Sequence, residues 1–108
     1  MISLIESKKD DLAILCRRFA IRRLDVFGSA VKGTFDPQSS DLDFIVDLGA
    51  YERSVADRFL DFADALETLF GRPVDLITED SIVNPYFRKA VNAARETVFE
   101  DRDAAAAA

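Results

Sequence analysis

The sequence predicts an α+β (two-layer α/β) domain in which about four helices pack on a small mixed β-sheet of about three strands. Short apolar segments with strand periodicity alternate with longer segments of helical periodicity, and Gly or Pro residues separate several of these segments. The chain has 108 residues, which is enough for one core, and 49% of them are hydrophobic, including nine Phe. We therefore expect a single domain over residues 1–103, followed by a low-complexity alanine tail at 104–108 without assigned function.

The first predicted helix covers about Ser7 to Phe19. Its apolar residues recur three or four positions apart, at Leu12, Leu15, Cys16 and Phe19. A single cysteine allows no intrachain disulfide and no zinc cluster. We interpret Cys16 as a buried thiol of a cytoplasmic protein.

A predicted strand follows at Arg22 to Phe27 and ends at Gly28. Residues Ser29 to Lys32 have the composition of one or two helical turns, which Gly33 ends. The next residues, Thr34 to Ser40, are rich in Asp, Pro and Ser and predict a loop. The order is therefore strand, glycine turn, helix start and loop.

A second strand is predicted at Asp41 to Leu48, where polar and apolar residues alternate. Ser54 is placed to cap the following helix. The apolar stripe of that helix advances by four or three residues, at Val55, Phe59, Phe62, Leu66 and Leu69. Gly71 and Pro73 predict its end.

The third predicted strand is Val74 to Thr78. Asn84 and Pro85 then provide a capping residue and an N1 proline for a last helix. We expect this helix to carry an apolar stripe at Phe87, Val91, Ala94 and Val98.

The charge pattern limits the classes of partner. The net charge of −6 repels nucleic acid and anionic lipid, so we expect no direct nucleic-acid or membrane binding. The sequence shows no apolar run long enough for a membrane span and no signal peptide, which predicts a soluble cytoplasmic protein. Because the chain has no His, its chemistry must come from carboxylates, hydroxyls, cations and bound ions.

Two aspartates of the second strand form a candidate metal site. Asp41 and Asp43 lie two residues apart, so they share one face of the strand, about 7 Å apart, while Leu42 and Phe44 lie on the other. Oxygen-rich carboxylate pairs suit hard divalent cations such as magnesium. An isolated Asp-x-Asp is more often a loop end followed by a solvated strand face, so this pair is ambiguous alone.

Gly28 and Ser29 form a candidate phosphate site between a strand and a helix start. Glycine allows a phosphate to approach the backbone, and the amides at the start of a helix and the Ser29 hydroxyl can donate hydrogen bonds to it. The alternative is an ordinary turn in which Ser29 caps a helix.

Asp75 is the third candidate carboxylate. If its strand lies in register beside the second strand, Asp75 shares the face of Asp41 and Asp43. Three converging carboxylates repel one another when the site is empty, which suits a site that fills with magnesium and triphosphate. Since the turn, the pair and the third carboxylate occur in this order within about fifty residues, coincidence is the weaker explanation.

The segment Phe27-Gly28-Ser29, the eleven-residue interval and Asp41-Leu42-Asp43 resemble the signature of the DNA polymerase beta-like nucleotidyltransferase superfamily. Within it the chain is most similar to the minimal nucleotidyltransferases. Asp75 and the Asn84-Pro85 helix entry also match, so the resemblance covers nearly the whole chain. The interval is one residue longer than is usual in the family, in a loop where length costs little.

The resemblance implies the nucleotidyltransferase fold and a role for each motif residue. Gly28 and Ser29 would bind the β and γ phosphates of ATP. Asp41 and Asp43 would bind two magnesium ions, and Asp75 would complete one metal site and accept the proton of the acceptor hydroxyl. Lys32 would assist a phosphate or remain a solvated lysine at the helix end.

The resemblance also implies a partner. Minimal nucleotidyltransferases of this size are often encoded beside a HEPN-type ribonuclease toxin, which implies an antitoxin that transfers AMP from ATP to a tyrosine of that toxin. The expected assembly is a hetero-oligomer of the two proteins. Two alternatives stay open: a catalytically silent antitoxin that neutralises its partner by binding, and a nucleotidyltransferase that modifies a small molecule such as an antibiotic.

Overall fold

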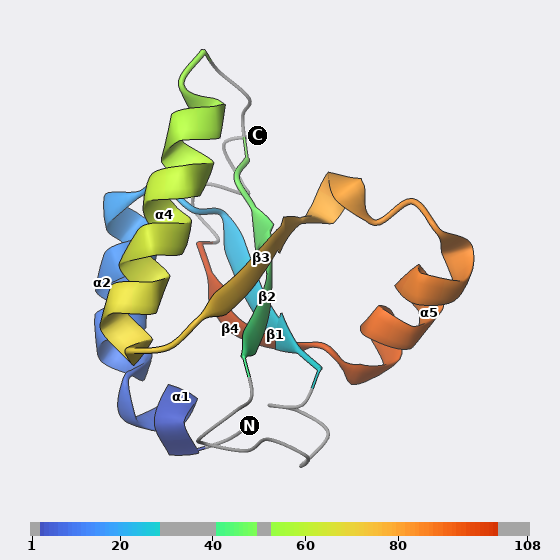
Figure 1. The fold of residues 1–108 in the computed structure, drawn as a ribbon, viewed down its shortest axis with the longest axis horizontal. Helices are drawn as coiled ribbons and strands as arrows, with labels where there is room; N and C mark the ends of the chain where they lie inside the picture. The colour runs from blue at the N-terminus through green and yellow to red at the C-terminus, as the bar shows by residue number, and fades with distance from the viewer. Residues whose placement is uncertain (1–2, 29–40, 50–52, 102–108) are drawn as a thin grey trace.

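The computed structural model describes residues 3–28, 41–49 and 53–101, which form a mixed β-sheet with helices on both of its faces (Figure 1). The elements in chain order are α1 (Ser3–Ser7), α2 (Lys9–Arg18), β1 (Arg23–Phe27), β2 (Leu42–Asp47), α4 (Val55–Phe70), β3 (Val74–Thr78), the 3₁₀ turn η1 (Glu79–Ser81), α5 (Pro85–Ala94) and β4 (Glu96–Glu100). Within these ranges, none of the helices has the length and apolarity needed to cross a bilayer.

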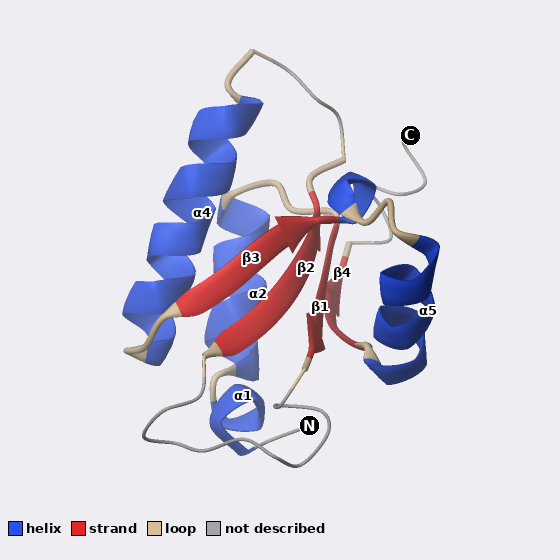
Figure 2. Cartoon of the chain, turned by 45° about the vertical axis from the view of Figure 1, so that its right-hand side comes forward, coloured by secondary structure: helices blue, strands red, loops and turns tan. Residues whose placement is uncertain are grey.

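The sheet has the strand order β3-β2-β1-β4. β1 runs antiparallel to both β2 and β4, whereas β2 and β3 are parallel. Helices α2 and α4 lie against one face and α5 stands on the opposite side (Figure 2). The predicted α+β class with a small mixed sheet is confirmed, with one strand more than expected.

The main hydrophobic core lies between the sheet and helices α1, α2 and α4. Leu12 of α2, Phe62 of α4 and Phe44 of β2 are all fully buried in it. Cys16 is also fully buried, which confirms the predicted buried thiol, and burial raises its pKa to about 12. A thiol with this pKa stays protonated and unreactive at neutral pH.

The predicted end of α4 and the predicted start of α5 are confirmed. Gly71 ends α4 in the left-handed conformation, and its amide donates a hydrogen bond of 2.8 Å to the Glu67 carbonyl. At the start of α5, Asn84 Oδ1 accepts hydrogen bonds from the amides of Tyr86 and Phe87 at 2.9 and 3.1 Å.

The predicted cap at Ser54 is wrong. Ser54 occupies the N-cap position of α4, but its side chain makes no capping hydrogen bond. Its backbone has φ −95° and ψ 12°, outside the extended conformation from which a capping side chain reaches the first free amides.

The predicted last helix is too long, and the fourth strand was not expected. Helix α5 ends at Ala94, because Arg95 adopts an extended backbone with ψ 144°. The following residues pair with β1 as β4, so Val98 is buried in the main core as a strand residue. The four-residue spacing from Ala94 to Val98 fits a helix locally, but pairing with the open edge of β1 satisfies the backbone better.

The first helix is also divided differently from the prediction. Helix α2 begins at Lys9, and the separate helix α1 precedes it at Ser3–Ser7. The predicted turn Ser29–Lys32, the loop Thr34–Ser40 and the alanine tail at 104–108 lie outside the described residues.

Candidate active site

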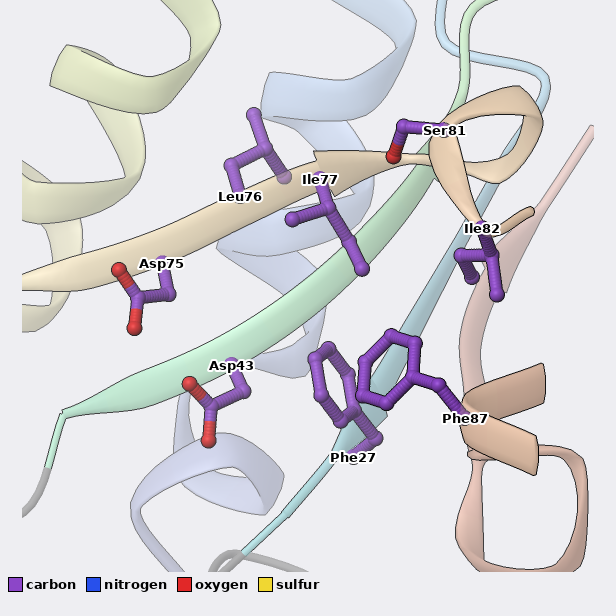
Figure 3. Close-up of a pocket in the computed structure, with 8 residues that line it drawn as sticks. All are labelled: Phe27, Asp43, Asp75, Leu76, Ile77, Ser81, Ile82 and Phe87. Atoms are coloured by element: carbon purple, nitrogen blue, oxygen red, sulfur yellow. The ribbon is translucent and has the colours of Figure 1, made fainter. Parts of the chain in front are cut away.

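The face of the sheet opposite the main core carries the candidate carboxylates. In β2, Leu42 and Phe44 are fully buried in the core, so the intervening Asp43 points to the other side. β3 pairs with β2 in parallel and places Asp75 directly beside Asp43. Figure 3 shows the two carboxylates side by side on neighbouring strands.

The register therefore brings two of the three candidate carboxylates together, as expected. Asp41 lies one residue before β2 and is exposed, and its negative charge contributes to the raised pKa of Asp43. The roles of Asp41, Asp43 and Asp75 as metal ligands or bases remain predictions.

The carboxyl group of Asp43 has a clearly raised pKa. Its pKa is raised from 3.8 to about 6, first by burial, then by the charge of Asp75, a hydrogen bond with Asp75, and the charge of Asp41. Asp43 therefore holds its proton to a higher pH than an isolated aspartate does. A cation bound between the carboxylates would remove the repulsion that raises this pKa.

Gly28 packs directly against this carboxylate. Its φ is +74°, and a Cβ built on it would overlap with Asp43 Oδ2. The position thus requires glycine for two reasons, the left-handed backbone and the space that the carboxylate occupies. Ser29 and Lys32, which complete the predicted phosphate site, lie outside the described residues.

The donor set fits a hard divalent cation by its chemistry. Asp43 and Asp75 present carboxylate oxygens, the ligands that magnesium prefers, and their mutual repulsion would be relieved by a positive ion. Among residues 3–28, 41–49 and 53–101, the side chains form no ready-made group of three or more acidic or thiol ligands.

A pocket of about 500 Å³ extends from the two carboxylates along the sheet. It is lined by Phe27, Asp43, Asp75, Leu76, Ile77, Ser81, Ile82 and Phe87 (Figure 3). The aspartates form its polar end, and aromatic and aliphatic side chains form an apolar wall. Such a combination suits a ligand with a charged group and a flat or apolar part.

The apolar wall comes from elements far apart in the sequence. Phe27 ends β1 and Phe87 lies in the first turn of α5, and their rings meet edge to face with centroids 6.4 Å apart. Ile77 follows Asp75 on the same face of β3. The sequence prediction assigned Phe87 to a helix stripe and did not identify this wall, although the two-residue step from Asp75 to Ile77 was a usable signal.

A buried ion-pair cluster lies on the same face of the sheet and was also missed. Asp25 of β1 is fully buried, and its two oxygens accept hydrogen bonds from Arg23 Nε at 3.0 Å and Arg95 Nε at 2.6 Å. Arg95 also forms a two-pronged pair with Glu79 of η1. The available signal was Asp25 itself, a charged residue at the centre of an apolar strand.

Residues 11–98 match the model of a family described as nucleotidyltransferase domain. This range covers most of the chain and includes Gly28, Asp41, Asp43 and Asp75.

Two curated archaeal proteins are similar in sequence. A protein of Methanocaldococcus jannaschii, with protein adenylyltransferase as its provisional name, is 32% identical over 78 residues, which are 72% of this chain and 77% of its own length. The protein adenylyltransferase MntA of Thermococcus cleftensis is 32% identical over 80 residues, 74% of this chain and 75% of its own length.

Solved structures share the fold. A structure described provisionally as a minimal nucleotidyltransferase has a TM-score of 0.68 and 28% identity, and the match covers 88% of this chain and 95% of that one. A complex of an MNT antitoxin with the tri-AMPylated HEPN toxin of Shewanella oneidensis has a TM-score of 0.62 over 92% of this chain and 75% of that one. At 15% identity, the second likeness shows the fold alone.

Proposed function

The chain belongs to the nucleotidyltransferase domain family, and we propose that it is a magnesium-dependent protein adenylyltransferase whose acceptor is a tyrosine of a HEPN-type toxin. The observation that carries this proposal is the pair Asp43 and Asp75, which lies beside Gly28 at the polar end of an open pocket. In this role the protein is an antitoxin, and its complex with the toxin is a hetero-oligomer.

The reaction joins the acceptor oxygen to the α-phosphorus of ATP and breaks the bond from that phosphorus to pyrophosphate. Asp75 accepts the proton of the acceptor hydroxyl, since its exposed carboxylate lies at the open edge strand. Gly28 lets the triphosphate approach the backbone, together with Ser29. Two magnesium ions, held by Asp41, Asp43 and Asp75, would supply the positive charge that offsets the triphosphate.

The apolar wall orients the substrates within the pocket. Phe27, Phe87 and Ile77 offer ring and aliphatic surface next to the carboxylates, where a nucleoside or a phenol ring can pack. A domain of this size encloses little of a free small acceptor, which favours a protein partner that brings both the hydroxyl and the remaining walls.

The relatives support the choice of donor and partner. MntA of Thermococcus cleftensis is named a protein adenylyltransferase, and one structure with this fold pairs an MNT antitoxin with an AMPylated HEPN toxin. A further toxin–antitoxin structure with this fold contains AMP-PNP, an ATP analogue. We infer a cytoplasmic location, because ATP is the substrate.

The decisive test is incubation of the protein with labelled ATP, magnesium and the HEPN protein encoded beside it. We expect label on a tyrosine of that protein. Label only on an added aminoglycoside would favour the small-molecule enzyme, whereas a tight complex without label would favour an antitoxin that acts by binding.

Asp75→Asn is the variant that tests the assigned base. We expect it to retain ATP binding but to lose transfer, because the amide can accept no proton at neutral pH and is a poorer metal ligand. Binding is measured by calorimetry and transfer by label on the toxin. Transfer at the wild-type rate would refute the role of Asp75.

A further inference from the structure

We propose that Arg95 is a positioning residue, which holds α5 and η1 over the sheet and thereby places Ile82 and Phe87 in the apolar wall of the pocket. It acts through a set of side chains that we call the Arg95 network, made up of Asp25, Glu79, Arg88 and Arg95. The kinetic part of this inference rests on the proposed function, and its structural part does not.

Arg95 connects three elements with one guanidinium group. It follows the last residue of α5, and its side chain is only 13% exposed. Its Nε donates to Asp25 of β1, while Nη1 and Nη2 donate to the two carboxylate oxygens of Glu79 in η1 at 3.0 and 2.5 Å. A planar guanidinium that fills such a fork fixes the relative orientation of its partners.

Arg88 extends the network to the loop before α5. Its Nη1 donates to Glu79 Oε1 at 3.0 Å, and its Nη2 donates to the carbonyl oxygens of Glu79 and Ile82 at 3.0 and 2.9 Å. Arg88 therefore binds the backbone of the η1 turn from within α5.

Two apolar residues of the pocket, Ile82 and Phe87, lie next to these anchors. Ile82 directly follows η1, and its carbonyl oxygen accepts a hydrogen bond from Arg88. Phe87 directly precedes Arg88 in the chain. Both side chains line the pocket at the end away from Asp43 (Figure 3). A shift of η1 or α5 would therefore move the wall relative to the carboxylates on β2 and β3.

Apolar packing alone gives α5 a modest attachment. The cluster beneath it has the buried residues Ile45, Ile82 and Val91, with Phe27 and Ile77 packed at its margin. The core on the other face is much larger. The ion pairs with Asp25 and Glu79 are thus a substantial part of what holds this side of the molecule together.

Glu79 stays ionised near neutral pH within this network. Hydrogen bonds from Arg95, and then from Arg88, hold the pKa of Glu79 at about 2, although partial burial opposes them. Loss of Arg95 would leave the buried Asp25 with Arg23 alone and Glu79 with Arg88 alone. Ile82 and Phe87 would then lose their ion-pair link to β1, while the carboxylates of Asp43 and Asp75 stay in place.

The test compares Arg95→Met with Arg23→Met. Arg23 pairs with the same buried carboxylate, but its other contacts, with Thr97 and Glu100, join β1 to β4. We expect Arg95→Met to raise the KM for ATP or for the acceptor by about tenfold, with kcat within about threefold of the wild type. Arg23→Met should leave both KM values within about twofold.

Two further variants keep the test decisive if Arg95→Met fails to fold. Glu79→Gln preserves the volume of the side chain but removes its charge, and Arg95→Lys keeps a cation without the planar fork. Both variants should raise the KM for the same substrate that Arg95→Met affects, but by a smaller factor than the tenfold expected for that variant. KM values equal to those of Arg23→Met in all of them would overturn the inference.

Amide hydrogen exchange separates this inference from the proposed function. If the wild type transfers no AMP, the proposed function fails, and exchange over residues 82–94 still reports on the wall. Faster exchange there in Arg95→Met than in Arg23→Met supports a positioning role for Arg95, and equal exchange in the two variants refutes it.

Discussion

At the scale of single residues, the site depends on the packing of Gly28 against Asp43. The glycine has a left-handed backbone, and its missing side chain leaves the space that Asp43 Oδ2 occupies. The contact places Gly28, the proposed phosphate-binding residue, beside Asp43, the proposed metal ligand.

Gly28→Ala should therefore impair both stability and transfer. We expect a loss of about 2 kcal/mol in the free energy of unfolding, from left-handed strain plus the displaced carboxylate, and at least about a tenfold loss of transfer rate. Urea denaturation and label transfer measure the two effects.

Gly71→Ala is the matched control. Gly71 also has positive φ, at +66°, but a Cβ on it would meet no atom within 4 Å. We expect a loss of about 1 kcal/mol of stability with transfer unchanged. If both variants lost transfer equally, backbone strain would account for the effect and the contact with Asp43 would not.

The raised pKa of Asp43 predicts a pH-dependent stability in metal-free buffer. Because its folded pKa of about 6 exceeds the ordinary value of 3.8, the folded state binds the proton more tightly than the unfolded state does. The stability that the protonated Asp43 contributes to the folded state is fully present below about pH 4 and is lost as the pH rises through 6. Asp43→Asn should therefore gain stability relative to the wild type between these limits.

The expected gain is on the order of 1 kcal/mol, since solvent screens a partly exposed group and the full shift overstates the energy. Urea denaturation of both proteins in a chelating buffer, at about pH 4 and pH 7.5, measures it. A difference that stays constant with pH would show that Asp43 titrates normally.

At the scale of elements, the start of α5 determines where Phe87 enters the pocket. Asn84 Oδ1 accepts two of the free amides of the first turn, including that of Phe87 itself. The proline at position 85 adds a preset backbone angle at the first helical residue. A secure helix start thus fixes the backbone that carries the aromatic ring.

Asn84→Ala should lower the free energy of unfolding by about 1 kcal/mol, because the two amides lose their acceptor. Lys89→Ala, at an exposed position of the same helix, should change it by less than about 0.5 kcal/mol. Urea denaturation measures both. Equal effects would mean that the Asn84 cap contributes nothing to α5.

At the scale of the whole molecule, the net charge of −6 and a pI of 4.6 set the kind of partner surface that associates readily. A partner with a basic surface would be attracted from a distance, and such attraction acts mainly on the association rate. Exposed charges of this kind are screened beyond about 8 Å at physiological salt.

Association with the proposed toxin should accordingly slow with salt. We expect the association rate to fall by about tenfold between roughly 50 and 500 mM salt, with a smaller change in dissociation. Stopped-flow mixing of the two proteins measures both rates. An association rate that does not depend on salt would argue that charge attraction has no part in the encounter.

Much of the architecture follows from the sequence, because periodicity and turn residues act over a few positions. The stripe from Val55 to Leu69, the stop at Gly71 and the start at Asn84 are each visible within one segment, and each corresponds to an observed element. The face of Asp43 is equally local, since alternation with Leu42 and Phe44 along the strand assigns it.

Tertiary structure alone decided the features that join distant segments. The pairing of Asp43 with Asp75, the conversion of Glu96–Glu100 into a strand, and the burial of Asp25 against Arg95 depend on contacts across the sheet. These contacts gain their free energy only when both segments are in place, so neither segment encodes them by itself. Local sequence thus determined which residues face one way, and long-range packing determined which of them meet.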